Sequence, residues 1–240
     1  MDVRGGAGVA GCCRASVDCS GCPVRAIAVC SSLAAEELCE LARIAAWRRL
    51  AAGQTLFDEG APVENVYTLT GGMLKLCKVT RDGRRQITGF LLPGDFIGLA
   101  FADSYVYGAE AVVDSEVCRF RRDPFERLLQ RHPRLERELL GRATTEIAAA
   151  QEQILLLGRK TARERVASFL LGLCQRQQIG DGGRLHLPMS RLDIGDYVGT
   201  RVETVSRVLT LLCRDGVLAM PTPHVILINS LRRLREEAQP

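Results

Sequence analysis

The sequence lacks long apolar stretches. Nowhere do about 18 apolar residues follow one another without interruption, and the N-terminus has no basic region followed by an apolar block, so neither a membrane span nor export is indicated. The three histidines, His132, His186 and His224, are scattered, and no pair has the spacing of metal ligands on one helix face. No nucleophile paired with a base and no glycine-rich phosphate loop is found. We therefore expect a cytoplasmic protein that is not an enzyme and contacts no membrane.

The composition is that of a protein with hydrophobic cores. Of its 240 residues, 47% are hydrophobic and 25% are charged, which suits one large domain or two small ones. The net charge is +4, and it is unevenly distributed: residues 158–240 hold 13 Lys or Arg against 8 Asp or Glu, which is +5 and leaves −1 for the rest. A polyanionic partner is therefore expected in the C-terminal third.

Cysteine is abundant, with ten in the chain. In a reducing compartment thiols do not form structural disulfides, so clustered cysteines are better interpreted as metal or redox ligands. Cys19 and Cys22 form a C-x2-C pair, and Cys30 follows after seven residues. Gly21 and Pro23 favour the tight turn that two ligands three positions apart require. This N-terminal segment predicts a metal site.

The remaining sequence divides into three patterns. Short β-type runs separated by Gly, Pro and Asp turns extend from about residue 51 to 120 and predict a small antiparallel barrel or roll. Helical periodicity follows to about residue 178, with a break before Pro133. Two short helices and a hairpin end the chain. We expect a flexible cysteine-rich leader (1–32), a β-roll (33–123), a long helix (124–158) and a C-terminal domain (159–240).

Residues 190–209 have the form of a helix-turn-helix. Ser190 is expected to cap the first helix, Gly199 to form the turn, and Thr200 to cap the second helix. The following side chains are expected to point inward: Leu192, Ile194, Tyr197, Val198, Val202, Val205, Leu209 and Leu212.

The outer face of the second helix carries residue types that read DNA bases. These residues are Arg201, Glu203, Thr204, Ser206 and Arg207. Arg can donate two hydrogen bonds to guanine, Glu can accept one from cytosine, and Ser can do either. Glu203 and Arg207 are four positions apart, so they could also simply pair with each other.

The run Val202-Glu203-Thr204-Val205-Ser206-Arg207 resembles the E-x-x-S-R recognition helix of the CRP/FNR family of bacterial transcription regulators. Residues 53–60, 66–67, 72–75 and 93–98 are similar to that family's β-roll signature. The resemblance implies an α+β fold: an antiparallel β-roll of the cyclic-nucleotide-binding type, a long dimerisation helix and a winged helix-turn-helix. It implies a homodimer on palindromic double-stranded DNA with TTGAT-type half-sites, with Glu203, Ser206 and Arg207 reading bases and the β-roll contacting RNA polymerase.

The resemblance also bears on what is sensed. Cyclic-nucleotide members place a Glu after PGD-F-x-G and later an Arg-Ser pair, whereas here Leu99 holds the Glu position and residues 105–109 contain no Arg, so no cyclic nucleotide is expected. The cysteine pattern resembles the oxygen-sensing FNR type, which implies a [4Fe-4S] cluster on Cys19, Cys22, Cys30 and Cys118, with Cys118 expected at a strand end of the roll. Zinc and unligated thiols stay alternatives. Cys12 and Cys13 are either substitute ligands or spectators.

The long helix carries one apolar seam with alternating spacings of three and four, which is typical of a two-stranded coiled coil. Its positions are Leu140, Ala143, Ile147, Ala150, Ile154 and Leu157. The seam could instead pack on the β-roll. The leading hypothesis is an oxygen-responsive dimeric regulator. Its alternatives are a regulator of the same fold that senses haem-bound gas or disulfide formation, and an iron-sulfur electron carrier that would leave the helix-turn-helix unexplained.

Overall fold

A computed structural model describes residues 17–19, 21–98 and 103–239 of the chain. Cys12, Cys13 and Leu99 lie outside the described residues. The chain divides into two compact units, Met1–Leu74 with Leu91–Thr144, and Lys75–Phe90 with Thr145–Pro240. These boundaries differ from those of the four-part organisation expected from the sequence, which stays a prediction.

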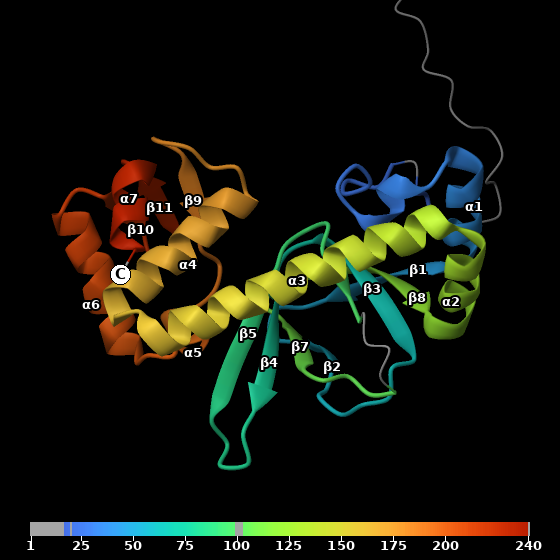
Figure 1. Cartoon of the computed structure of the whole chain (residues 1–240), viewed down its shortest axis with the longest axis horizontal. Helices are drawn as coiled ribbons and strands as arrows, with labels where there is room; N and C mark the ends of the chain where they lie inside the picture. Colours follow the sequence, from blue (N-terminus) through green and yellow to red (C-terminus); the bar gives the residue numbers. More distant parts are fainter. Residues whose placement is uncertain (1–16, 20, 99–102, 240) are drawn as a thin grey trace, which may run out of the picture. The chain divides into compact units, whose positions relative to one another are not determined.

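The first unit is built on an antiparallel sheet in the order β1-β8-β3-β6. Its strands are β1 (Ala45–Leu50), β3 (Asn65–Gly71), β6 (Phe96–Ile97) and β8 (Ser115–Arg121). β2 (Thr55–Phe57) and β7 (Gly108–Ala111) also pair in antiparallel fashion. The sheet is covered by the short helix η1 (Val29–Ser32), by α1 (Ala35–Ile44), by α2 (Arg122–Arg131) and by the first part of α3 (Pro133–Arg159) (Figure 1). The predicted antiparallel roll and the helix break before Pro133 are confirmed.

The core of the first unit lies between this sheet and its helices. It contains Val66, Phe96, Cys118 and Phe120 from the strands, and helical side chains such as Leu41. The N-terminal segment joins this core, since Val17, Val29 and Leu33 are buried in it. The described residues of the leader, 17–19 and 21–32, are folded against the unit because their apolar side chains find partners there, and the flexibility expected of the leader stays a prediction.

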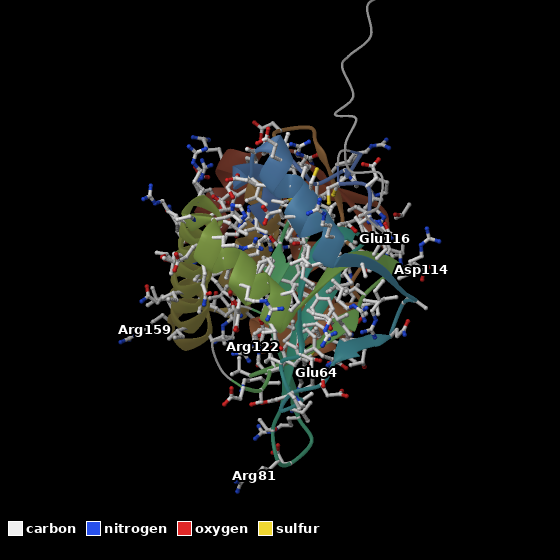
Figure 2. The ribbon with its side chains drawn as sticks, turned by 90° about the vertical axis from the view of Figure 1, so that its right-hand side faces the viewer. Glu64, Arg81, Asp114, Glu116, Arg122 and Arg159 are labelled. Carbon is white, nitrogen blue, oxygen red and sulfur yellow. The ribbon has the colours of Figure 1, made fainter. Side chains whose placement is uncertain are left out.

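The second unit combines a two-stranded ribbon with a winged helix-turn-helix. The ribbon is β4 (Leu74–Val79), which starts at the last residue of the first unit, and β5 (Arg85–Leu91). Arg81 lies at its tip (Figure 2). The remaining elements are the rest of α3, α4 (Ala162–Arg176), β9 (Arg184–His186), α5 (Arg191–Val198), α6 (Val202–Arg214), β10 (Leu218–Thr222), β11 (Val225–Ile228) and α7 (Leu231–Glu237).

The wing is a three-stranded antiparallel sheet in the order β10-β11-β9. The sequence predicted its hairpin, and the structure adds β9, whose Leu185 pairs with Ile226. Both side chains are buried, so the wing is anchored to the helices by its apolar face. Among the described residues no helix is long and apolar enough to cross a membrane.

Candidate functional site

Three leader cysteines are brought next to the sheet of the first unit. The leader turns at Cys22, whose carbonyl accepts a hydrogen bond from the Arg25 amide, and continues into η1, which contains Cys30. Cys19 and Cys30 pack against the core that contains Cys118. Cys118 is the fourth of the seven residues of β8. The sequence placed it at a strand end, which is wrong: it sits mid-strand and is buried.

Three of the four thiols have raised pKa values. Burial raises the pKa of Cys118, and the charges of Cys19, Cys22 and Cys30 raise it further. Burial, followed by the charges of Cys30 and Cys22, raises the pKa of Cys19 to about 11. Burial and the charge of Cys22 also raise the pKa of Cys30. Raised pKa values favour the protonated form of Cys19, Cys30 and Cys118 at neutral pH, so binding of a metal there would release their protons.

The leader is tied to α3 by one side chain. Arg142 of α3 donates from Nη2 to the Ile27 carbonyl at 2.7 Å and from Nη1 to the Gly94 carbonyl at 3.0 Å. Gly94 has a φ of 100°, a conformation that favours glycine, and a Cβ there would have to displace the Ile27 side chain, which it would meet at 2.9 Å. The residue that follows Arg142 is Ala143, a position of the predicted dimer seam.

The donor set suits a thiolate-bound metal. Four cysteine sulfurs are the ligands of a [4Fe-4S] cluster and equally of tetrahedral zinc. Within the described ranges, no three His, Cys, Asp or Glu side chains are yet gathered tightly enough to hold an ion. Cys19, Cys22, Cys30 and Cys118 fit such a group by the chemistry of their sulfurs, and three of them, Cys19, Cys30 and Cys118, share one core.

The two helices of the predicted helix-turn-helix are set by local signals. Ser190 caps α5 as predicted: its hydroxyl accepts from the Asp193 amide at 3.0 Å. Gly199 ends α5 with a φ of 66°, a left-handed conformation that favours glycine. Thr200 was expected to cap α6, but the cap position is Arg201, which makes no side-chain cap bond. The helix therefore starts one residue later than expected, at Val202.

The recognition helix α6 has one buried and one exposed face. Val205, Val208, Leu209 and Leu212 are buried, and Arg201, Glu203, Ser206 and Arg207 are exposed, while Thr200 and Thr204 are half-buried. The Ser206 hydroxyl donates to the Val202 carbonyl at 3.0 Å, which leaves its lone pairs open to a base donor. Leu192 of α5 was predicted to point inward, but it is 54% exposed.

The ribbon β4–β5 packs on α5 through a cluster of charges that sequence reasoning missed. Lys75 and Arg85 both contact Asp193 Oδ1, at 3.0 and 2.8 Å. Arg85 also bonds Asp196 at 2.8 Å. Beside them, Phe90 and Tyr197 rings lie 5.5 Å apart. These contacts connect chain segments more than 100 positions apart, so no local pattern could have indicated them.

The end of α3 is joined to the helix-turn-helix by hydrogen bonds. Arg165 donates to the Leu157 carbonyl at 2.8 Å and to the Gly199 carbonyl at 3.2 Å. Gln153 of α3 donates to the Tyr197 carbonyl at 2.7 Å. The turn between α5 and α6 is therefore fixed to the helix that carries the predicted dimer seam.

That seam is largely exposed in the single chain. Leu140, Ile147, Ala150 and Ile154 are exposed, with Ile147 at 60%, while Ala143 and Leu157 are half-buried. A row of exposed large apolar side chains on one helix marks an interaction surface.

Comparison with known proteins identifies the family. A model described as a cyclic nucleotide-binding domain matches residues 47–132, and one described as a Crp-like helix-turn-helix domain matches residues 164–237. The chain is 38% identical to the transcriptional activator protein FnrL of Cereibacter sphaeroides over 92% of this chain and 91% of that protein. It is 40% identical to the nitrogen fixation regulation protein FixK of Bradyrhizobium diazoefficiens over 89% and 91%.

A solved structure agrees with these matches. The structure of FixK2 from Bradyrhizobium japonicum has a TM-score of 0.78 and 37% identity, covering 82% of this chain and 98% of that one. The expected combination of β-roll, long helix and winged helix-turn-helix is thus confirmed. The chain belongs to the CRP/FNR family of transcription regulators.

Proposed function

We propose that this regulator is an oxygen-responsive activator that holds a [4Fe-4S] cluster on Cys19, Cys22, Cys30 and Cys118. The observation that supports it is that Cys19 and Cys30 pack against the core that contains Cys118, where the charges of Cys19, Cys22 and Cys30 add to burial in raising the pKa of Cys118. When bound, such a cluster would supply sensitivity to oxygen. The chain itself would position three ligands through the turn at Cys22 and the short helix η1, and the fourth on a buried strand.

The proposed DNA target is a palindrome of TTGAT-type half-sites. Arg207 would donate to guanine, and Glu203 and Ser206 would contact neighbouring bases, because all three side chains lie on the exposed face of α6. Arg201, Thr200 and Thr204 would contact the backbone or the base edges nearby. A palindrome requires two copies of this helix about 34 Å apart, so we propose that the α3 seam forms a homodimer.

RNA polymerase is the proposed partner of the activator, since relatives at 38% identity are named transcriptional activators. We expect no cyclic nucleotide in the β-roll. The described segment around Tyr105 has no arginine, and Tyr105 instead stacks on Phe57 with ring centroids 3.7 Å apart. The face of the Tyr105 ring that stacks on Phe57 is therefore not available to a nucleotide base.

A regulator of the same fold without a cluster is the second candidate. It is favoured by the finding that no three candidate ligands of the described residues are gathered into metal-binding geometry. In that case the neighbouring thiols would respond to oxidation directly.

The test is to purify the protein without oxygen and record its absorption. A cluster gives a broad band near roughly 400 nm that air bleaches, and zinc gives none. Cys118→Ser should abolish the band and the iron content, while Cys174→Ser, a buried cysteine of α4 in the other unit, should retain both. Full iron in the Cys118→Ser protein would overturn the ligand assignment.

Trp47 offers a second, independent readout. It is the single tryptophan of the chain and pairs with Cys118 across β1 and β8. Because an absorbing iron-sulfur group accepts excitation energy from a nearby indole, loading should quench the fluorescence of Trp47. Zinc loading should not quench it in this way, because zinc has no visible absorption.

A further inference from the structure

The Thr68 hydroxyl is buried without a hydrogen-bond partner. Thr68 lies in β3 and is 3% exposed. Among the described residues, only its Oγ1 and one Arg191 nitrogen are buried side-chain atoms without a hydrogen bond. Two positions along the same strand, the Thr70 hydroxyl donates to the Glu116 carbonyl at 2.8 Å. A buried hydroxyl normally finds a partner, since leaving it unpaired costs folding free energy.

The strand register places Thr68 beside Cys118. Thr68 is directly opposite Cys118 of β8 and, on its other side, opposite Phe96 of β6. Directly opposed residues of antiparallel strands project from the same face of the sheet, with Cβ atoms about 4.5–5.5 Å apart. Cys118 and Phe96 belong to the core against which Cys19 and Cys30 pack. The unpaired hydroxyl therefore lies on the thiol-bearing face.

The other neighbours on this face do not satisfy Thr68. Val66 and Phe120 form the next cross-strand pair and are apolar. Trp47 opposes Cys118 from the far side, on β1, so Cys118 stands between Trp47 and Thr68. Apart from backbone groups and the Trp47 indole nitrogen beyond Cys118, the polar side-chain atoms of the residues named on this face are sulfurs.

We propose that Thr68 is a positioning residue that donates a hydrogen bond to a sulfur of the bound iron-sulfur cluster, either Cys118 Sγ or an inorganic sulfide. This inference rests on the proposed function. Cluster sulfurs carry negative charge and accept hydrogen bonds, and such bonds raise the reduction potential of the cluster. In the chain without a cluster the Thr68 hydroxyl has no hydrogen-bond partner, and binding of the cluster would provide one.

The central comparison is Thr68→Val, which keeps the shape of the side chain and removes the hydroxyl. In cluster-free protein, Thr68→Val should raise the melting temperature, because an unpaired buried hydroxyl is replaced by a methyl group. In cluster-loaded protein it should lower the reduction potential and hasten loss of iron to a chelator. A purely structural role would shift both forms in the same direction.

Resonance Raman spectra of the loaded protein give a direct readout. When the cluster is assembled in D2O, the Fe–S stretching bands of the wild type should shift, because the hydroxyl bonded to sulfur carries deuterium. The D2O shift should be smaller in Thr68→Val than in the wild type, and Thr68→Ser should restore it. The matched control is Thr70→Val, whose hydroxyl already has a carbonyl partner; it should destabilise both forms and leave the bands unchanged.

The outcomes separate this inference from the proposed function. If the wild type purified without oxygen shows no iron-sulfur absorption, the proposed function is wrong. A wild type that loads normally, with Thr68→Val matching it in potential, iron retention and D2O shift, would overturn the role of Thr68 alone. If Thr68→Val does not fold, the wild type and Thr68→Ser are compared instead. Absence of a D2O shift in the Fe–S bands of both proteins would then overturn the role of Thr68.

Discussion

Lys75 and Asp193, 118 positions apart in the chain, form a buried ion pair with 3.0 Å between Nζ and Oδ1. The two side chains are only 7% and 10% exposed. Asp193 also completes the capping box of α5, so this pair links the ribbon to the start of the helix-turn-helix. A buried charge that loses its partner is strongly destabilising, whereas an exposed pair contributes little.

Replacing Lys75 by Met should lower the free energy of unfolding by about 1–3 kcal/mol, because Asp193 keeps Arg85 and Ser190 but loses one donor. Urea unfolding measures this. The matched control is Arg84→Met in the same ribbon, whose pair with Asp82 is exposed and should hardly change the stability. Equal effects of the two substitutions would mean that the buried pair contributes no more than a surface one.

The stability should also depend on pH through Asp193. Burial acts to raise the pKa of this carboxyl, but hydrogen bonds from Ser190 and Lys75 and the Lys75 charge outweigh it, so the pKa lies below its ordinary 3.8. A lowered pKa stabilises the fold above about pH 4, and this contribution is lost as the pH falls further. Wild type should therefore lose more unfolding free energy than Asp193→Asn between about pH 5 and pH 3. Identical pH profiles would contradict this.

Arg207→Ala should weaken binding to a TTGAT palindrome by about 1–3 kcal/mol per lost guanine contact and relax the preference at that base pair. Binding to random DNA should fall much less. Fluorescence anisotropy with both DNAs at one salt concentration measures the ratio. The control is Arg232→Ala on α7, an exposed arginine outside the recognition helix. The same loss on both DNAs would show that Arg207 contacts only phosphate.

Ile147→Glu should produce a monomer that retains its cluster and loses palindrome binding. The substitution puts two carboxylates opposite each other in the seam of α3, where Ile147 is 60% exposed in the single chain. Anaerobic sedimentation measures the association state. Glu146→Gln, one position away, is the control. An undiminished dimer would show that the seam is not the interface.

Arg142→Met should release the leader from α3, because it removes both bonds to the Ile27 and Gly94 carbonyls. Trypsin should then cleave after Arg25 several-fold faster, since opening of the leader costs less free energy. Mass spectrometry of the fragments follows the cut. Arg137→Met, an exposed position on the same helix, is the control. Unchanged cleavage would mean that the buried apolar side chains alone hold the leader.

Local patterns predicted the elements that local chemistry determines. The turn at Gly199, the Ser190 cap and the buried face of α6 were all readable because their signals lie within a few residues. Thr200 failed as a cap because helix starts are decided by one-residue differences in backbone conformation. The prediction that Leu192 points inward was wrong, because helical periodicity does not show how far the buried face of a helix extends to each side.

Relationships between distant strands were out of reach of the sequence. The pairing of Thr68 with Cys118 depends on register, and register follows from how the whole sheet assembles. In its local sequence Lys75 is an ordinary polar residue of a strand, and no neighbouring residue indicates that it pairs with Asp193. The four thiols were grouped through a family resemblance, and their ligand role stays a prediction.

Residues 75–90 belong to the same compact unit as the helix-turn-helix, which has consequences for the folding of this unit during translation and for the exchange of gene segments. The ribbon leaves the ribosome more than 100 residues before Asp193 does, so the reading module is complete only when nearly the whole chain has been translated. A gene fragment that begins at residue 145 encodes α5 without Lys75, Arg85 and Phe90. Exchange of C-terminal segments between relatives therefore preserves a working module only if the charges at 75 and 85 are inherited together with those at 193 and 196.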